Sequence, residues 1–503
     1  MRFFKKIFGR PALIVTLLVL QLLIIFLPLA FAQQVFWPIQ AGGYIIGILF
    51  VLYILSRKEY PEFKIPWLVL TFLVPVYSVT VYILLAHPKP KKKDARFLTA
   101  VNKKVSGFLP KENQSGAGEY SAAAEYISKT SYDFGYSDSA IEYFKDGADF
   151  WQDLLSELEK AENFIFMEYF VLSTGEMWEK ISDILRLKIK QGVEVRLLYD
   201  DIGSLKGVKG NYFKKLRKEG INCYKFNPFR FILSGIYNNR DHRKITVIDG
   251  KVGYTGGVNI ADEYINRKKR FGYWKDSAVK LRGGAVDNLT AMFLLLFDTT
   301  AKKTSEYGKY FPKEKEMFTG GGYIHPFGDG PRPYYKEQVS ENNYLNLINS
   351  AKKYVYITTP YLICDYTVIT ALRNAALRGV TVKIVTPSIP DKKTIFAMTR
   401  ATFPQLLEAG VKIYSYTPGF IHAKMLLADD NAAYIGTANL DYRSFVHHYE
   451  CGALICYAPC LKDVKRDITE IIDASSEITS ENFKMGKMAK VASSVLTLFS
   501  PML

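Results

Sequence analysis

The chain contains one set of polar residues twice at a fixed separation, and this duplication limits its fold more than any other feature. The two copies are His242-x-Lys244-x4-Asp249-x6-Gly256-Gly257-x-Asn259 and His422-x-Lys424-x4-Asp429-x6-Gly436-Thr437-x-Asn439. Every position of the second copy follows its counterpart by 180 residues, and the pair uses two of only six histidines. A single short motif often arises by coincidence, but two matching copies indicate a duplicated structural unit.

Segments around the two motifs repeat as well, in the same order. Residues 161–170 match 351–360, residues 191–199 match 378–386, and residues 218–224 match 408–414, with offsets of 190, 187 and 190. The segments follow the pattern of a helix, a Gly turn and then a strand of β-branched residues, which is typical of alternating α/β layers. We therefore predict an α/β fold in two halves, 136–325 with the motif 242–259 and 326–503 with the motif 422–439.

The residue types of the motif suit a phosphodiester. In a strand, residues i and i+2 face the same side, so each His points with its Lys toward one spot. A site shared by both halves would offer two His, two Lys and two Asn as donors to phosphate oxygens. One histidine can act as nucleophile while the other serves as acid and then as base, and the lysines neutralise charge without a metal or other cofactor.

The remaining motif residues have supporting places in this interpretation. Asp249 and Asp429 lie about a strand's length from the histidines, so we expect them to hold the site together by hydrogen bonds. Contacts to the substrate phosphate are predicted for residues that bring backbone or amide donors close: Gly257, Thr437, Asn259 and Asn439. The five cysteines form no CxxC pair, so neither a disulfide framework nor a zinc site is indicated.

The N-terminal region reads as a membrane anchor. Three stretches without charged residues, about 11–32, 39–55 and 65–86, are each predicted to span a bilayer, and a polar linker follows over 87–135. The first stretch has a second interpretation, because Ala30-Phe31-Ala32 after a basic start is typical of a cleaved signal peptide. The sequence leaves open whether this segment is retained.

Charge indicates a lipid partner and argues against nucleic acid. The first hundred residues account for +9 of the net charge of +17, so the basic character gathers beside the apolar runs. Seven basic residues would lie on one side of the membrane, four before the first stretch and three in the loop between the second and third, whereas residues 33–43 carry none. This asymmetry favours a multi-pass cell-membrane protein with its body on the external face. Five more basic residues over 89–96 contradict that orientation, so the sidedness stays open.

The paired motif resembles the HKD motif of the phospholipase D superfamily, and within it the chain is most similar to bacterial cardiolipin synthases. The similarity covers residues of about 60–503 and includes the segments 255–264, 358–361 and 436–444. It implies two α/β/α halves related by a pseudo-twofold axis, with N-terminal transmembrane helices before them. It also implies transphosphatidylation, in which two phosphatidylglycerol molecules yield cardiolipin and glycerol.

The resemblance further implies individual roles. His242 would form a phosphatidyl-histidine intermediate and His422 would act as acid and base, although the near-symmetric halves allow the opposite assignment. Asp276 and Glu450 are the candidate carboxylates that orient the two imidazoles. His325, His447 and His448 are interpreted as non-catalytic loop histidines, and His87 as an interfacial one.

Three alternatives remain open at this stage. The same intermediate can be hydrolysed by water, which would make the chain a phospholipase D or a nuclease, and another phospholipid can serve as donor or acceptor. A membrane scaffold with a decayed site is disfavoured by the intact His, Lys and Asp in both copies. The sequence does not define an oligomeric state.

Overall fold

The computed structural model describes residues 19, 33–85, 92–229, 238–332 and 334–502. The chain divides into two compact parts, and each is described by itself. The N-terminal part comprises residues 1–90, 229–239 and 494–503, and the second part, called the body here, comprises residues 91–228 and 240–493.

Three helices form the described core of the N-terminal part. They are α3 (Gln33–Ser56), α4 (Pro61–Leu73) and α5 (Pro75–Leu85). They pack around a small apolar cluster of Phe50, Ile54, Trp67, Val81 and Tyr82. Large apolar side chains elsewhere on these helices are exposed, among them Ile48, Leu49, Leu52, Phe72 and Ile83.

This arrangement changes the predicted spans. The stretch 11–32 lies outside the described residues, and 39–55 falls inside α3. The stretch predicted as one span over 65–86 is two helices, because Pro75 disfavours a helical conformation at Val74, whose φ is −147°. Within the described ranges, no helix combines the length and the hydropathy that a membrane crossing requires.

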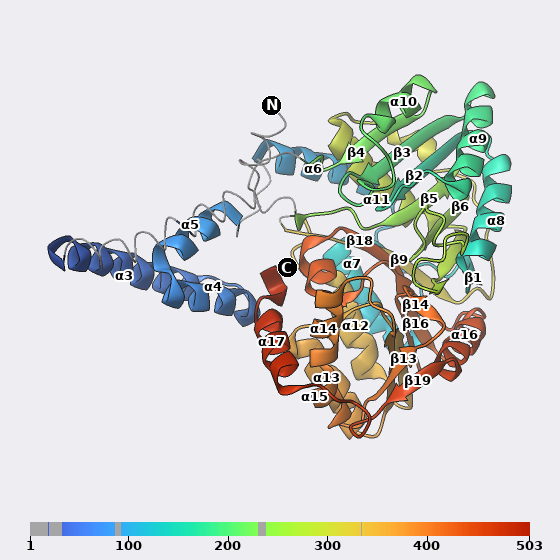
Figure 1. Cartoon of the computed structure of the whole chain (residues 1–503). Coiled ribbons are helices and arrows are strands. Elements are labelled where there is room, and N and C mark those ends of the chain that lie inside the picture. Colours follow the sequence, from blue (N-terminus) through green and yellow to red (C-terminus); the bar gives the residue numbers. More distant parts are fainter. Residues whose placement is uncertain (1–18, 20–32, 86–91, 230–237, 333, 503) are drawn as a thin grey trace. The chain divides into compact units, whose positions relative to one another are not determined.

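The body contains two large sheets (Figure 1). Their strand orders match. The first has the order β1 (Ala140–Phe144), β8 (Ala278–Arg282), β6 (Val252–Gly256), β5 (Lys244–Ile248), β2 (Phe164–Tyr169), β3 (Glu194–Asp200), β4 (Asn222–Phe226). Strands β2, β3 and β4 are parallel, and the other neighbours are antiparallel.

The second sheet repeats this order strand for strand and adds one edge strand. Its order is β9 (Tyr323–Asp329), β18 (Glu450–Cys456), β16 (Ala432–Gly436), β15 (Met425–Ala428), β10 (Tyr354–Thr358), β12 (Thr381–Pro387), β13 (Lys412–Tyr416), β19 (Ser475–Ile478). The repeated segments 161–170, 191–199 and 218–224 contain or overlap β2, β3 and β4, and their matches contain or overlap β10, β12 and β13. The predicted duplicated α/β fold is confirmed.

Helices cover the sheets because their apolar residues recur at helical spacing. The helices of the body are α6 (Lys92–Val105), α7 (Ser121–Ser131), α8 (Gly147–Glu159), α9 (Glu176–Lys190), α10 (Tyr212–Lys218), α11 (Val286–Ala301), α12 (Val339–Ser350), α13 (Tyr366–Leu377), α14 (Lys393–Ala401), α15 (Phe403–Leu407) and α16 (Leu461–Asp473); α17 (Lys487–Leu498) ends the series and runs past the boundary of the body. Helices α8 and α9 bury Trp151 and Trp178 on one face of the first sheet. The other face shares one continuous core with the second sheet.

Two predicted boundaries need correction. The linker expected over 87–135 contains α6 and α7, and α6 buries Leu98, Val101 and Val105 in the body's core. The division between the halves at 325/326 falls inside β9, which pairs with β18 along its whole length. The second half therefore begins at or before residue 323.

Candidate active site

Each histidine segment pairs with a strand segment of the opposite half. His242 lies just before β5, its backbone N–H donates to Tyr449 O at 2.9 Å, and the adjacent residue Asp241 forms a parallel bridge with Tyr449. His422 follows β14 (Gly419–Ile421), which pairs in parallel with β7 (Tyr273–Lys275), and its N–H donates to Lys275 O at 2.7 Å. These reciprocal pairings bring both copies of the motif into one site.

The same exchange brings each imidazole to a carboxylate of the other half. His242 Nδ1 lies 2.9 Å and 3.0 Å from the two carboxylate oxygens of Glu450, and His422 Nδ1 lies 2.6 Å from Asp276 Oδ2. Both carboxylates are fully buried, while His242 and His422 retain 6% and 9% exposure. A carboxylate at Nδ1 fixes the ring orientation and leaves Nε2 free to react.

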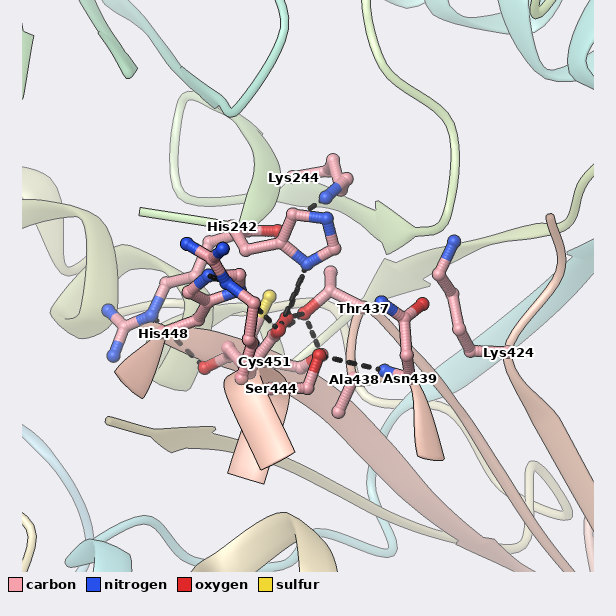
Figure 2. A network of polar contacts seen from close by, with 12 residues as sticks. His242, Lys244, Lys424, Thr437, Ala438, Asn439, Ser444, His448 and Cys451 are labelled. Atoms are coloured by element: carbon pink, nitrogen blue, oxygen red, sulfur yellow. Dashed lines mark hydrogen bonds and ion pairs between the residues drawn. The ribbon is translucent and has the colours of Figure 1, made fainter. Parts of the chain in front are cut away.

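The two lysines lie beside the imidazoles, as the i, i+2 spacing predicts. Lys244 Nζ donates to the backbone oxygen of His242, and Lys424 Nζ lies 2.7 Å from His422 Nδ1. Figure 2 shows Lys244 joined to His242, and Asn439 joined to Ser444 in the same group of polar contacts. The arrangement concentrates positive charge where a phosphate group would bind.

Asp249 and Asp429 hold strands in place and do not reach the imidazoles. Both have left-handed backbone conformations, φ 54° and 53°, in the hairpins that follow β5 and β15. Asp249 accepts the backbone N–H groups of residues 162, 163 and 164 at 2.7–2.8 Å, and Asp429 accepts those of residues 352, 353 and 354 at 2.5–2.8 Å. These bonds fix the starts of β2 and β10, so the two aspartates are positioning residues.

The small residues of the motif make room for the orienting carboxylates. A Cβ atom on Gly257 would lie 1.9 Å from Asp276 Oδ1, which makes glycine necessary there. In the second half, the Thr437 hydroxyl donates to Glu450 Oε2 and accepts from Cys451 N at 2.9 Å. The structure thus places these two positions against carboxylates, although they were predicted to contact the substrate phosphate.

The two asparagines differ in their bonding. Both amide atoms of Asn259 have a partner, since its Oδ1 accepts from Val171 N at 2.9 Å and its Nδ2 donates to Tyr264 OH at 2.7 Å. Asn439 Nδ2 donates to Asp441 Oδ2 at 3.2 Å, while its buried Oδ1 has no hydrogen-bond partner within the described structure. The Asn439 Oδ1 atom is an acceptor, so it suits the hydroxyl group of a ligand and not a phosphate oxygen.

His448 is a site residue that the sequence analysis missed. Only 8% of it is exposed, and its ring centroid lies 5.4 Å from that of His242. Its Nδ1 lies 3.6 Å from Glu450 Oε1, and its Nε2 faces Arg443 Nε at 3.4 Å. The sequence signal for this histidine is its position two residues before Glu450, because residues i and i+2 of an extended segment face the same side.

The remaining histidines are His325, His447 and His87. His325 is a buried strand residue of β9, not a loop residue, and its Nε2 bonds Asp133 O at 2.9 Å. Burial lowers the pKa of His325 to about 4. His447 is half-buried at the end of a short π-helix, and His87 lies outside the described residues.

Burial and mutual repulsion lower the proton affinity of the four central groups. Burial, with Lys424 beside it, lowers the pKa of His422 to about 4 although Asp276 opposes the shift, and burial with Lys244 holds the pKa of His242 well below its usual value. Burial lowers the pKa of Lys244 to about 8 and that of Lys424 to about 7. Both imidazoles are therefore neutral at pH 7 and can act as nucleophile or base.

The orienting carboxylates differ from one another in pKa. Burial raises the pKa of Glu450 well above its usual value, although Lys244 and Thr437 oppose it. Burial acts in the same direction on Asp276, but His422 and Lys424 outweigh it and hold the pKa of Asp276 below its usual value. Asp276 is the stronger partner for a positively charged imidazole.

Three side chains of the site have the donor types of a metal centre. His242, His448 and Glu450 offer ligand atoms that all lie within 4.8 Å of one another, the one such grouping among the described residues. Two imidazoles and a carboxylate are ligands that Zn²⁺ accepts. Lys244 approaches the same groups, and its charge opposes a cation there.

Comparison with known proteins identifies the family. A family model described as cardiolipin synthase, PLD-like domain, matches residues 154–273 and 344–472. A cardiolipin synthase from a Geobacillus species is 35% identical over 91% of this chain and 92% of its own length. The chain belongs to the cardiolipin synthases of the phospholipase D superfamily.

Further relatives agree in length and fold. A cardiolipin synthase of Staphylococcus aureus is 33% identical over 92% of this chain and 96% of its own. A protein of Streptococcus mutans without an assigned function is 40% identical over 90% and 99%. The crystal structure of a phosphatidylserine synthase from Haemophilus influenzae, 15% identical, superposes on 76% of this chain and 98% of its own with a TM-score of 0.56, which supports the fold.

Proposed function

We propose that the protein is a phosphatidyltransferase that converts two phosphatidylglycerol molecules into cardiolipin and glycerol through a phosphohistidine. The observation that carries the proposal is the reciprocal pair of His–carboxylate contacts, His242 with Glu450 and His422 with Asp276. Two oriented imidazoles and two lysines in one buried site match the needs of a two-step displacement at phosphorus. Membership in the cardiolipin synthases supports the choice of lipid.

The steps follow from the arrangement. Nε2 of one histidine attacks the phosphorus of the donor and the bond to the headgroup glycerol breaks. The other histidine, which takes up a proton when the anionic phosphodiester binds beside it, gives its Nε2 proton to the leaving oxygen. That second histidine then removes the proton of an acceptor hydroxyl, the oxygen attacks phosphorus, and the N–P bond breaks. Lys244 and Lys424 balance the charge that develops on the phosphoryl oxygens.

We assign His242 as the nucleophile and His422 as the acid and base. The lowered pKa of Asp276 supports the assignment, because an ionised carboxylate stabilises the imidazolium that the acid–base histidine must form. A donor with a p-nitrophenyl leaving group needs little protonation. His422→Asn should therefore still form a covalent adduct with it, detected by intact-protein mass spectrometry, and His242→Asn should not. The reverse pattern would exchange the roles.

Burial of the site favours transfer over hydrolysis. Both catalytic histidines are at least nine-tenths buried, which limits the access of bulk water to the intermediate. Full-length protein in phosphatidylglycerol vesicles should form cardiolipin and free glycerol in equal amounts, measured by lipid mass spectrometry and a glycerol assay. Phosphatidic acid as the sole lipid product would replace this proposal by a phospholipase D.

The N-terminal part is proposed to hold the enzyme at the membrane that contains its substrates. Exposed apolar side chains on α3, α4 and α5, including Ile48, Leu52 and Phe72, support contact with lipid. Alkaline carbonate extraction of native membranes tests the proposal, and release of the protein into the supernatant would contradict integral insertion. Protease protection of the body in sealed vesicles would determine whether it lies on the external face.

A further inference from the structure

The two halves differ in the connection between the motif Asn and the orienting carboxylate. From Asn259 to Asp276 the chain is six residues longer than from Asn439 to Glu450. The longer connection includes four consecutive cations, Arg267, Lys268, Lys269 and Arg270, which we call the basic turn. The pseudo-symmetric second half has no such run in its connection.

The basic turn presents largely uncompensated charge to solvent. All four residues are exposed. Among the described residues, only Arg267 of the four forms an ion pair, with Glu176 at 3.3 Å. Arg270 lies over the ring of Phe271 at 4.9 Å, a contact that leaves its charge in place. The turn is therefore a concentrated cationic surface and not one side of a salt-bridge network.

The turn is held rigidly next to a catalytic histidine. Asn266, with a left-handed φ of 58°, accepts from Trp274 N at 2.7 Å and donates to Trp274 O at 3.1 Å. The Trp274 ring lies 5.3 Å from that of His422, and its strand β7 pairs with the strand that leads to His422. These contacts of Asn266 and Trp274 anchor the turn that carries the four cations at the His422 side of the site.

Aromatic side chains accompany the cations. Tyr273 is 39% exposed, and the half-buried Phe271 contacts Phe420 with ring centroids 5.9 Å apart. Amphipathic rings beside Lys and Arg are typical of surfaces that lie at the headgroup level of a bilayer. Each basic residue near an anionic surface adds to the attraction within about a Debye length.

We propose that the basic turn docks on the anionic phospholipid headgroups of the bilayer and holds the His422 side of the site at the lipid surface. The inference rests on the proposed function, because the lipid on which the turn docks and the proposed substrate are both anionic phospholipids. It assigns the turn to capture of lipid from the surface and gives it no part in the chemical step.

The test compares two fourfold variants of the full-length protein. The first, R267Q/K268Q/K269Q/R270Q, removes the basic turn, and the control, K206Q/K209Q/K214Q/K218Q, removes four exposed lysines from the first half. Both are reconstituted in phosphatidylcholine vesicles with increasing fractions of phosphatidylglycerol. Cardiolipin and phosphatidic acid are counted together as turnover.

The turn variant should need about tenfold more phosphatidylglycerol for half-maximal rate, with kcat within twofold of wild type. The dependence of its KM on NaCl should also weaken, while the control keeps the wild-type KM and salt dependence. Unchanged KM in the turn variant, an equal change in both variants, or a loss confined to kcat would each overturn the proposal. Loss of binding to heparin or polynucleotide with unchanged KM would overturn it in favour of a soluble polyanion.

The assay separates this inference from the proposed function. If wild type forms only phosphatidic acid, the transferase proposal fails, but the comparison of KM between the variants still reports on lipid docking. If cardiolipin forms and the variants are indistinguishable, the docking inference fails alone.

Discussion

Among single-atom changes in the site, replacement of the Asp276 carboxylate oxygen that contacts His422 should have the largest effect on kcat. In Asp276→Asn, the amide oxygen keeps the backbone N–H of Ser277, which donates to Oδ1 at 2.9 Å, because an amide NH₂ there would face another donor. The NH₂ group then faces His422 Nδ1, which Oδ2 contacts at 2.6 Å in the wild type. Nδ1 must become the acceptor, so Nε2 carries the proton.

An imidazole with a protonated Nε2 is unable to accept the proton of an incoming hydroxyl. Loss of the correct tautomer typically costs a factor of about 10³–10⁴ in kcat, or about 4–5.5 kcal/mol of transition-state stabilisation. The binding groups Lys244 and Lys424 remain, so KM for phosphatidylglycerol should change by less than threefold. Initial rates of product formation in vesicles of defined composition give both constants.

Asp329→Asn is the matched control. Asp329 is equally buried and also accepts backbone N–H groups, from Gly330 at 2.7 Å and Ser340 at 2.8 Å. Among the described residues, no imidazole forms a hydrogen bond or ion pair with its carboxylate. Both variants should lose similar stability, and only Asp276→Asn should lose kcat per folded molecule. More than a tenth of wild-type kcat in Asp276→Asn, or an equal loss in Asp329→Asn, would refute the orienting role.

Three further predictions follow from the electrostatics and hydrogen bonds of the site. Because Lys244 and Lys424 have pKa values of about 8 and 7, they lose charge as the pH rises, so kcat/KM should fall above about pH 7–8. Lys424→Arg should move this fall in kcat/KM to higher pH. A fall at the wild-type pH in this variant would show that Lys424 does not cause it. Asp429→Ala leaves three backbone N–H groups without their acceptor and should lower the free energy of unfolding by about 3 kcal/mol or more, so a melting temperature within 2 °C of wild type would contradict its positioning role. His448→Asn removes a group that lowers the pKa of His242, so the acidic limb of the pH–rate profile should move to higher pH; a profile unchanged at low pH would exclude this coupling.

Much of the fold could be predicted because the duplication appears directly in the sequence. The constant offset of the segments around His242 and His422 reports the strand-for-strand match of the two sheets. The division between the halves could not be predicted, because β9 contains His, Pro, Gly and Asp and does not have a clear strand pattern, and its pairing with β18 depends on the tertiary structure. The helices of residues 92–131 were obscured by polar residues on their exposed faces.

The site was less accessible to sequence reasoning where function depends on what surrounds a residue. Spacing predicts that a histidine and its lysine face one spot, but it says nothing of burial. Thr437 and Gly257 look like phosphate contacts in the motif, yet their neighbours are the orienting carboxylates. His448 escaped notice because adjacent histidines in a loop are usually exposed, whereas the start of β18 draws this one inside.

The exchange of strand pairs between the halves has a consequence for how activity can be lost or controlled. Each imidazole depends on the opposite half twice, for a backbone partner and for a carboxylate, so neither half holds a working set of groups alone. A separation of the halves by one or two ångströms would break both hydrogen bonds at once and disable both chemical steps together. Activity therefore depends on the contact between the two halves. Any ligand or lipid that changes the distance between the halves would change both chemical steps together.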